Sequence, residues 1–427
     1  MIHVIKYPDK KDWQELVKRP VFENASLESS VSKILDKVKS KGDKAIFKYT
    51  KKFDKVKLKD LAVTEKETRT VDCFFPEELK KAIQQAKSNI EKFHRSQIEQ
   101  STVIETMPGI YCWRKPVGIE KIGIYIPGGS APLFSTVLML AIPAVIAGCK
   151  EIILCTPPSK DGAVNPAILY AASLCGVTKI FKVGGVQAIA AMAYGTETIP
   201  KVFKIFGPGN QYVTCAKQLI QKDGVAIDMP AGPSEVLVIA DDAAVPEWVA
   251  ADLLSQAEHG ADSQVILLTT SENIAEKVQS CIEQQLEKLP RKEIAEKALV
   301  NSKIILLHTI DEAIELSNLY APEHLILSCT NAGELASNIT SSGSVFIGNY
   351  SPESVGDYAS GTNHTLPTNG YAAMYSGVSV DSFVKKITFQ QLSKEGLENI
   401  GSTVMQMAEA EGLDAHKNAV AIRLNNK

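Results

Sequence analysis

Four of the seven histidines lie in polar segments whose composition suits metal binding or proton transfer. They are His259 in SQAEHGADS, His324 in APEHL, His364 in DYASGTNH and His416 in EGLDAH. A neutral imidazole is a common metal ligand, and histidine titrates close to neutral pH. These four side chains are therefore the first candidates for a metal site or an acid–base site.

The pair Gln256 and His259 has the spacing of a metal half-site. The two residues are three apart near the end of a predicted helix, so both side chains project from one face, whereas Glu258 is turned about 100° away. A neutral amide oxygen is a weak zinc donor, and residue type alone favours a solvated or capping role for this pair. Asp357 could add a carboxylate and His416 a second imidazole. Two imidazoles and two oxygens would suit Zn²⁺, Mn²⁺ or Co²⁺.

Glu323 and His324 follow a proline and precede a predicted strand. Adjacent residues of an extended chain point to opposite faces, so we expect the two side chains to share no proton contact and to have different functions. One could accept a proton while the other activates a water molecule. The dipeptide alone favours a simpler interpretation, in which the histidine donates to a backbone carbonyl at a strand edge. His364 could equally cap or stabilise the loop that it shares with Asp357.

Four glycine-rich turns each follow a predicted strand: PGGS (127–130), VGGVQ (183–187), FGPGN (206–210) and PAGPS (230–234). Open α/β sheets bind ligands at the carboxyl ends of their strands, so this repeated placement predicts a nucleotide site, with tight structural turns as the alternative. The sequence has neither the G-x-G-x-x-G fingerprint nor the Walker motif. Any dinucleotide would therefore be bound without the usual fingerprint.

Short apolar strands alternate with helices from residue 122 to about residue 348, which is typical of parallel sheets covered on both faces. In the first unit, the expected strands are 122–127, 151–156, 179–185 and 202–210, and the expected helices are 134–148, 167–175, 187–193 and 212–220. In the second unit, the expected strands are 235–241, 263–270, 303–309, 324–328 and 344–348, and the expected helices are 246–259, 272–289, 292–299, 311–320 and 334–339. The predicted fold class is α/β, with two tandem Rossmann-like parallel-sheet units.

The two ends of the chain differ from this core. Residues 1–120 are charged and mostly helical in pattern, and apolar residues at three- and four-residue spacing predict helices over 31–54 and 76–100. Residues 349–377 form a polar segment rich in Gly, Ser and Asn, and loops of that length are often functional. A helical pattern returns over 387–412. We therefore expect small helical segments at both termini.

Composition excludes several classes of protein. Lys and Arg number 46 against 49 Asp and Glu, and the net charge of −3 gives no bulk attraction to nucleic acid or to an anionic membrane. The eight cysteines form no C-x-x-C pair, which excludes a thioredoxin-like motif, and single thiols are typical of the reducing cytoplasm. Proline and glycine interrupt the uncharged stretch 122–149, which we interpret as a buried strand, loop and helix rather than a membrane span.

Several long strings make the chain resemble the histidinol dehydrogenase family over essentially its whole length. They are GIYIPGGSAPLFSTVLM, FGPGNQYVT, DMPAGPSEVLVIAD, DLLSQAEHG, PEHL, SPESVGDYASGTNH and AHKNAV, in this order. The resemblance implies a zinc-dependent homodimer that oxidises L-histidinol through L-histidinal to L-histidine with two NAD⁺. It also implies shared active sites, because in this family the last segment of one subunit covers the site of the other.

The resemblance also implies a role for each matching position. The implied zinc ligands, for one ion per subunit, are Gln256, His259, Asp357 and His416. The implied catalytic pair is Glu323 and His324, with His324 as the base for the hydroxyl proton and Glu323 as the activator of water in the second oxidation. The implied substrate contacts are Ser234, Gln256, His259, His324, Asp357, Glu411 and His416. The implied NAD contacts are Tyr125, Gln187 and Asn210.

We expect the chain to divide into four parts. These are an N-terminal extension (1–20), a larger α/β domain (21–121 with 235–376), a second α/β domain (122–234) and a C-terminal helical segment (377–427) that reaches the partner subunit.

Two other functions remain open from the residues alone. A zinc hydrolase would use Glu323 and His324 to direct a water molecule, and a non-enzymatic scaffold would bind a small ligand without turnover. A cysteine nucleophile would compete with water in the second oxidation, but no cysteine lies within the strings quoted above.

Overall fold

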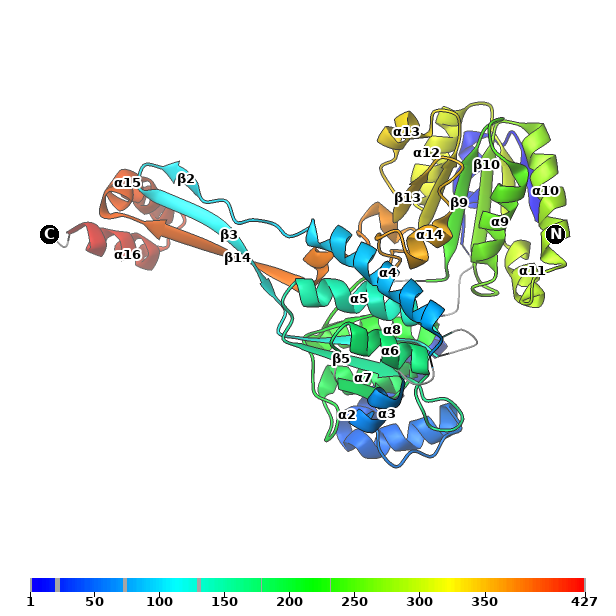
Figure 1. Ribbon diagram of the computed structural model, residues 1–427. Helices are drawn as coiled ribbons and strands as arrows, with labels where there is room; N and C mark the ends of the chain where they lie inside the picture. Colours follow the sequence, from blue (N-terminus) through cyan, green and yellow to red (C-terminus); the bar gives the residue numbers. More distant parts are fainter. Residues whose placement is uncertain are drawn as a thin grey trace.

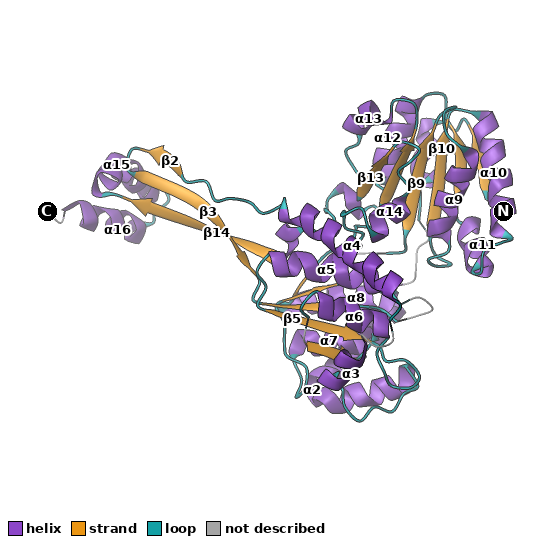
Figure 2. Cartoon of the chain, viewed as in Figure 1, coloured by secondary structure: helices purple, strands orange, loops and turns teal. Residues whose placement is uncertain are grey.

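The computed structural model of the chain describes residues 2–19, 24–71, 75–128, 132–177, 179–230 and 232–425. Cys73 and residues 129, 130 and 231 of two expected glycine-rich turns lie outside the described residues. Two α/β bodies and a long arm that projects from one of them make up the fold (Figure 1 and Figure 2). Within the described ranges, no helix is both long enough and apolar enough to span a bilayer.

The smaller body is built on a five-stranded sheet in which every pairing is parallel. Its strands, in spatial order, are β6 (Lys179–Lys182), β5 (Glu151–Thr156), β4 (Lys121–Tyr125), β7 (Lys204–Phe206) and β8 (Ala226–Ile227). Its own helices are α5 (Phe134–Ile146), α6 (Pro166–Leu174), α7 (Gly185–Tyr194) and α8 (Gln211–Ile220). The uncharged stretch 122–149 forms β4 and α5, as predicted, because both are buried in this body.

The larger body is built on a six-stranded sheet, again parallel throughout. Its strands, in spatial order, are β1 (His3–Lys6), β11 (Lys303–Leu306), β10 (Gln264–Thr269), β9 (Glu235–Ala240), β12 (His324–Ser328) and β13 (Ser344–Ile347). One face packs against α9 (Pro246–Ala257), α10 (Glu272–Leu286) and α11 (Lys292–Val300). The other face packs against α1 (Trp13–Leu16), α12 (Ile310–Tyr320) and α13 (Ala332–Leu335). The prediction of two parallel-sheet units is confirmed.

The N-terminal segments pack differently from the expected division into domains. β1 is an edge strand of the larger sheet, so residues 1–20 are not an extension outside that body. The helices α2 (Asn24–Phe53), α3 (Glu65–Thr70) and α4 (Glu77–Arg95) join the smaller body instead of the larger one, with α2 on α7 and α8 and with α4 on α5. The apolar stripe of α2, which includes Val31, Leu35 and Val38, completes the core of the smaller body. Only tertiary packing decides which of the two bodies this stripe packs against.

The arm is a three-stranded antiparallel sheet followed by two helices. Its strands are β2 (Ile104–Met107), β3 (Ile110–Gly118) and β14 (Val384–Leu392), and its helices are α15 (Lys394–Ala410) and α16 (Asp414–Asn425). The expectation of helix is therefore wrong over 387–392, whereas it is confirmed for α15. β2 and β3 lie in the N-terminal region that was expected to be mostly helical, outside the two helices predicted there. Pairing of β3 with β14 joins distant parts of the chain, and Trp113 stacks on Phe389 with ring centroids 5.4 Å apart. Local periodicity carries no signal for such a pairing.

Candidate active site

A polar cavity of about 150 Å³ lies between the two bodies. It forms where the amino ends of β9 and β12 face the glycine-rich turn after β7. The larger body contributes Ser234, Gln256, His259, Glu323, His324 and Asp357, and the smaller body contributes Thr136, Gly207, Lys217 and Asp228. Residues from six of the seven quoted strings therefore meet in one small space.

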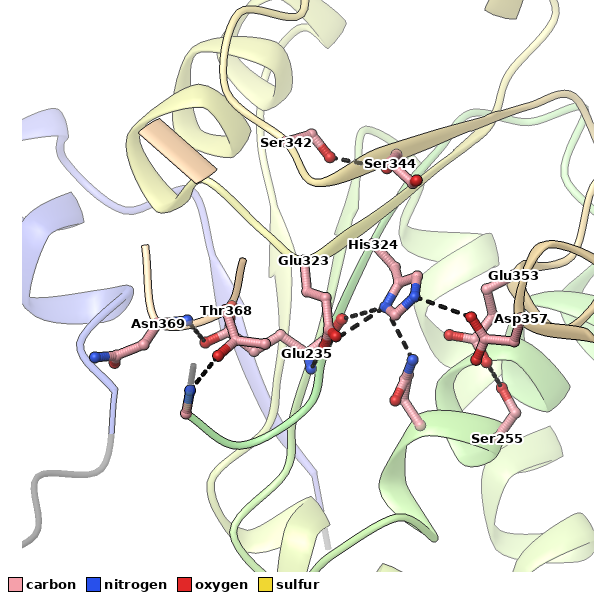
Figure 3. Close-up of polar contacts among 12 residues, drawn as sticks. Glu235, Ser255, Glu323, His324, Ser342, Ser344, Glu353, Asp357, Thr368 and Asn369 are labelled. Atoms are coloured by element: carbon pink, nitrogen blue, oxygen red, sulfur yellow. Dashed lines mark hydrogen bonds and ion pairs between the residues drawn. The ribbon is translucent and has the colours of Figure 1, made fainter. Parts of the chain in front are cut away.

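His324 is held at the centre of this cavity by four polar contacts (Figure 3). One of them joins its Nδ1 to Gln256 Nε2, 3.0 Å away. Its Nδ1 lies 3.1 Å from the carbonyl oxygen of Glu235 and 3.6 Å from Glu323 Oε2, and its Nε2 lies 3.2 Å from Asp357 Oδ1. Glu323 Oε2 also accepts a hydrogen bond of 2.9 Å from the backbone N–H of Glu235. The backbone of Glu235 thus orients both side chains.

Glu323 and His324 form no hydrogen bond with each other, as expected, but Glu323 Oε2 and His324 Nδ1 lie 3.6 Å apart, closer than opposite faces of a strand would place them. β12 begins only at His324, and Ala321 has a left-handed backbone with a φ of 51°, so the alternation of a regular strand does not extend to Glu323. The carboxylate instead turns back toward the imidazole. The simpler expectation of a histidine next to a backbone carbonyl describes Nδ1 correctly but leaves out the Nε2 contact with Asp357.

The two acidic groups and the imidazole change each other's proton affinity. Burial disfavours the charged imidazole, but the carboxylates of Glu323 and Asp357 outweigh that effect and raise the pKa of His324 to about 10. Burial raises the pKa of Glu323 to about 8, against the opposing charge of His324. Burial also opposes the charge of Asp357, yet the hydrogen bond from His324 lowers its pKa overall. The two carboxyl groups therefore favour the protonated form of the imidazole, against the effect of its burial.

Three side chains on one wall of the cavity fit a metal ion. Gln256 lies in the last turn of α9, His259 follows that helix with its backbone N–H 3.2 Å from the Gln256 carbonyl, and Asp357 lies in α14 (Glu353–Tyr358). The Oε1 atom of Gln256 is buried without a hydrogen-bond partner, and burial lowers the pKa of His259, which favours its neutral form. An unpartnered amide oxygen, a neutral imidazole and a carboxylate are three suitable donors. Within the described ranges, no group of three or more His, Cys, Asp or Glu side chains could hold a metal ion.

Glu411 and His416 do not reach the cavity of their own chain. Glu411 directly follows α15 and His416 lies in α16, so both are carried at the far end of the arm (Figure 1). Both residues are exposed, and neither lines the polar cavity. Within a single chain, the structure therefore brings together five of the seven expected substrate-contacting residues and separates the other two.

Tyr125, Gln187 and Asn210 line a second cavity of about 1120 Å³ at the carboxyl ends of the smaller sheet. The backbone N–H of Gly185 donates to the Tyr125 hydroxyl at 3.0 Å, and Asn210 caps α8 by accepting from the N–H groups of its first turn. Gln187 Oε1 is buried without a partner. A third cavity of about 570 Å³ shares Tyr125 and Asn210 with the large cavity and Ser234 with the polar cavity. The predicted nucleotide turns thus line three neighbouring cavities, and the smallest of these contains His324.

An ion pair that the sequence reasoning missed supports the catalytic segment. The guanidinium of Arg19 binds the Glu235 carboxylate, donates to the Tyr320 carbonyl at 2.7 Å and lies 3.9 Å from the centre of the Tyr320 ring. These contacts fix the chain just before Glu323 and at the start of β9. Arg19 lies in a charged segment without a motif, so no local signal could have found it.

Replacing Arg19 with methionine should destabilise the fold by about 3–5 kcal/mol, because it leaves a buried carboxylate without its charge partner. The Glu235 side chain is only 3% exposed. Urea unfolding should report this change. Replacing Lys10 with methionine is the control, because both side chains of the Lys10–Glu315 pair are 58% exposed, and the loss should stay within about 1 kcal/mol. Equal losses in the two variants would contradict a structural role for the buried pair.

His364 connects the two bodies beside the cavity. Its Nδ1 lies 2.7 Å from the backbone oxygen of Asp357, and its Nε2 lies 3.0 Å from the hydroxyl of Thr136 in α5. Burial lowers the pKa of His364, so the neutral ring can donate to the carbonyl and accept from the hydroxyl. The loop-stabilising role considered for His364 is supported, and Thr136 is a partner that the sequence did not reveal.

Two parallel-sheet bodies with a nucleotide-sized cavity near a buried acid–base group define an α/β oxidoreductase. Residues 17–424 match the sequence model of a family described as histidinol dehydrogenase. The histidinol dehydrogenase of Bacteroides thetaiotaomicron is 61% identical over 425 residues, which cover 100% of this chain and 99% of that protein. The histidinol dehydrogenase of Vibrio cholerae is 52% identical over 414 residues, which cover 96% of this chain and 95% of that protein. The crystal structure of histidinol dehydrogenase from Elizabethkingia anophelis is 60% identical, with a TM-score of 0.97 over 99% of this chain and 98% of that one.

The chain therefore belongs to the histidinol dehydrogenase family. It is a dehydrogenase, an oxidoreductase of histidine biosynthesis. The resemblance read from the sequence strings and the α/β fold class are both confirmed. Neither the zinc hydrolase nor the non-enzymatic scaffold agrees with this family.

Proposed function

We propose that the chain catalyses two successive NAD-dependent oxidations, of L-histidinol to L-histidinal and of L-histidinal to L-histidine. It does so as a cytoplasmic homodimer with one zinc ion per subunit and with no nucleic acid or membrane partner. The observation that carries this proposal is the position of His324, buried beside three metal donors in the smallest of the three neighbouring cavities. The described cysteines are all free thiols, which supports a reducing compartment.

Gln256, His259, Asp357 and His416 of the partner subunit would hold the zinc ion. The unpartnered Oε1 of Gln256 supports this assignment, and the substrate's own nitrogen atoms make one weak amide donor tolerable. When bound, the metal supplies a positive template that orients the substrate and stabilises negative charge. Ser234, Glu411 of the partner subunit and the four metal-binding residues would surround the substrate together with His324.

His324 acts as the general base in the first oxidation. The Nδ1 atom lies 3.1 Å from the Glu235 carbonyl and 3.0 Å from Gln256 Nε2. In the neutral ring, a proton on Nδ1 would be donated to that carbonyl and Nε2 would be the atom that accepts the hydroxyl proton. NAD⁺, when bound beside Tyr125, Gln187 and Asn210, supplies the acceptor for the hydride. Removal of the hydroxyl proton is what allows the hydride to leave the alcohol carbon.

Glu323 acts in the second oxidation, because an aldehyde has no hydroxyl proton to lose. Its carboxylate takes a proton from water, and the resulting hydrate of the aldehyde has the hydroxyl that His324 requires. Burial raises the pKa of Glu323 to about 8, which suits a group that exchanges a proton near neutral pH. No described cysteine lines the polar cavity, so water is favoured over a thiol as the nucleophile.

The arm would bring the missing residues from a second copy of the chain. Many large apolar side chains on its surface remain exposed in a single chain: Val103, Ile104, Met107, Tyr111, Ile387, Phe389, Met407, Leu413 and Ile422. An extended apolar surface of this kind is typical of an obligate subunit interface. A homodimer would cover this surface and would place His416 at the cavity of the partner subunit.

Chelation should abolish turnover without unfolding the protein. L-histidinol and NAD⁺ should give NADH with the untreated enzyme and none after a strong chelator, and added Zn²⁺ should restore the rate. Circular dichroism should stay unchanged, because the two sheet cores contain none of the metal donors. Turnover that survives removal of the metal, or loss of helical signal with it, would contradict a catalytic zinc ion.

A further inference from the structure

A buried ion pair in the wall of the polar cavity has no assigned function. Lys217 lies in α8 and pairs with Asp228, which directly follows β8, and the two side chains are only 5% and 2% exposed. Both residues line the cavity that contains His324. A buried ion pair gives little net stability compared with apolar side chains of similar volume. The stability of the smaller body therefore does not by itself account for this pair.

The fold brings the two side chains to one glycine-rich turn, residues 206–210, from different directions. Long helical side chains point back toward the helix N-terminus, and α8 begins directly after this turn, so Lys217 reaches back to it. Parallel pairing of Ile205 with Ile227 places Asp228 beside the end of β7, where the turn begins. The ion pair therefore forms next to the backbone of the turn.

Gly207 is held by both members of the pair. The Lys217 ammonium donates to the Gly207 carbonyl at 2.9 Å, and the Gly207 N–H donates to Asp228 Oδ2 at 2.8 Å. Because Lys217 and Asp228 also bind each other, the three residues form a closed ring of polar contacts. Hydrogen bonds to charged groups are stronger than those between neutral groups. A shift of Gly207 would lengthen at least one of them, so the ring fixes the position of the turn.

The turn lies between the proposed cofactor site and the proposed base. Gly207 has a φ of 123°, which favours glycine, and a Cβ atom at this position would collide with the backbone oxygen of Tyr125. Tyr125 lines the large cavity, so one side of the turn lies directly against that cavity's wall. The other side of the turn lines the polar cavity with His324. The position of Gly207 therefore sets the spacing between the two cavities.

We propose that the Lys217–Asp228 pair positions the Gly207 turn so that NAD⁺ and the alcohol carbon of the substrate meet at reacting distance. The inference rests on the proposed oxidation of L-histidinol and adds two positioning residues to it. The hydride passes with its electron pair from the alcohol carbon to NAD⁺, and the hydroxyl proton goes to His324. A misplacement of about 1 Å can slow a reaction by about 10²-fold. A loosened turn would therefore slow hydride transfer without removing any group that touches the substrate.

The pair contributes position rather than charge. Lys217 and Asp228 neutralise each other, so together they add no net charge beside Glu323 and His324. A variant that loses both charges at once therefore changes the support of the turn while the net charge of the cavity wall stays the same. Lys217→Met alone would leave a buried carboxylate without its charge partner, which is strongly destabilising. The double variant Lys217→Met/Asp228→Asn leaves no unpaired charge and should stay folded by circular dichroism.

The test is a single turnover by the full-length enzyme, with enzyme in excess and with L-histidinol that carries protium or deuterium at the alcohol carbon. The double variant should form the first NADH about 10- to 100-fold more slowly than the wild type, and deuterium should slow it further. The affinity for NAD⁺, measured by calorimetry, should change by less than about threefold, because the lost contacts matter in the transition state. With enzyme in excess, the rate constant does not depend on the fraction of folded protein, so a merely structural defect would not change it.

Two further variants complete the test. Asp228→Asn alone is isosteric and keeps an acceptor for the Gly207 N–H, so it should slow the turnover less than the double variant does, and it serves as the test if the double variant does not fold. Lys182→Met/Glu67→Gln is the control, because it removes another ion pair of the smaller body that lines none of the three cavities. It should leave the rate constant and the isotope effect unchanged.

Two results would overturn the inference. One is a rate constant within about threefold of the wild-type value in the folded double variant, or in Asp228→Asn if only that variant folds. The other is a slowed rate without an isotope effect, because a step other than hydride transfer would then be limiting. A wild-type chain that forms no NADH would contradict the proposed function itself, whereas normal turnover in the wild type and in these variants would contradict only the role of the pair.

Discussion

Co-expression of inactive His259→Ala and inactive His416→Ala chains should restore about a quarter of the unmutated activity. His259 lines the cavity of its own body, whereas His416 is exposed at the end of the arm. If the arm completes the partner's site, a mixed dimer has one site with both lesions and one with neither. Random pairing makes about half of the dimers mixed and half of their sites intact, which gives the quarter.

The matched control is co-expression of His259→Ala with Asp357→Ala. Both residues lie on the same wall of one body, so every site in a mixed dimer carries a lesion and no activity should return. Tagged chains purified in two steps would establish that mixed dimers form. If the His259 and His416 variants form mixed dimers that stay inactive, each chain completes its own site and the proposed dimer is wrong.

Glu323→Gln should oxidise L-histidinol far better than it oxidises supplied L-histidinal. A glutamine oxygen can still accept the hydrogen bond from the Glu235 N–H, so the geometry of the segment is preserved. It cannot take a proton from water, and loss of a general base typically slows a step by about 10²–10⁴-fold. We expect the oxidation of L-histidinal to slow by that factor, and the rate of L-histidinol oxidation to change by at most about tenfold. His324→Ala should slow both oxidations by the larger factor.

Single-turnover measurements with each substrate would separate the two oxidations. The Glu323 and His324 side chains are only 3.6 Å apart, so a modest change in the alcohol step of Glu323→Gln is expected from the altered charge next to the imidazole. Equal losses of both oxidations in Glu323→Gln would contradict the division of labour between these residues. Rescue of the aldehyde step by formate or another small carboxylate would support it.

The sequence by itself determined the parallel-sheet core. Runs such as EVLVIA and QVILLT are apolar throughout, which predicts strands buried on both faces, and they form β9 and β10 with every residue buried. Helices that follow such strands within a few residues can only return along the face of the sheet. The family resemblance then identified Gln256, His259, Glu323, His324 and Asp357, and the structure places all five in one cavity.

Tertiary structure alone decided how the ends of the chain are used. The apolar stripe of α2 could cover either sheet, because a stripe specifies burial but not the surface that provides it. Most of β14 carries a pattern that predicts helix, and it becomes a strand because it pairs with β3. Side-chain direction at Glu323 depends on one left-handed residue, Ala321, which local alternation does not reveal. His416 lies far from the cavity of its own chain because the arm carries it there. The arm helix and the cavity do not contact each other, so no sequence pattern indicates how far apart they lie.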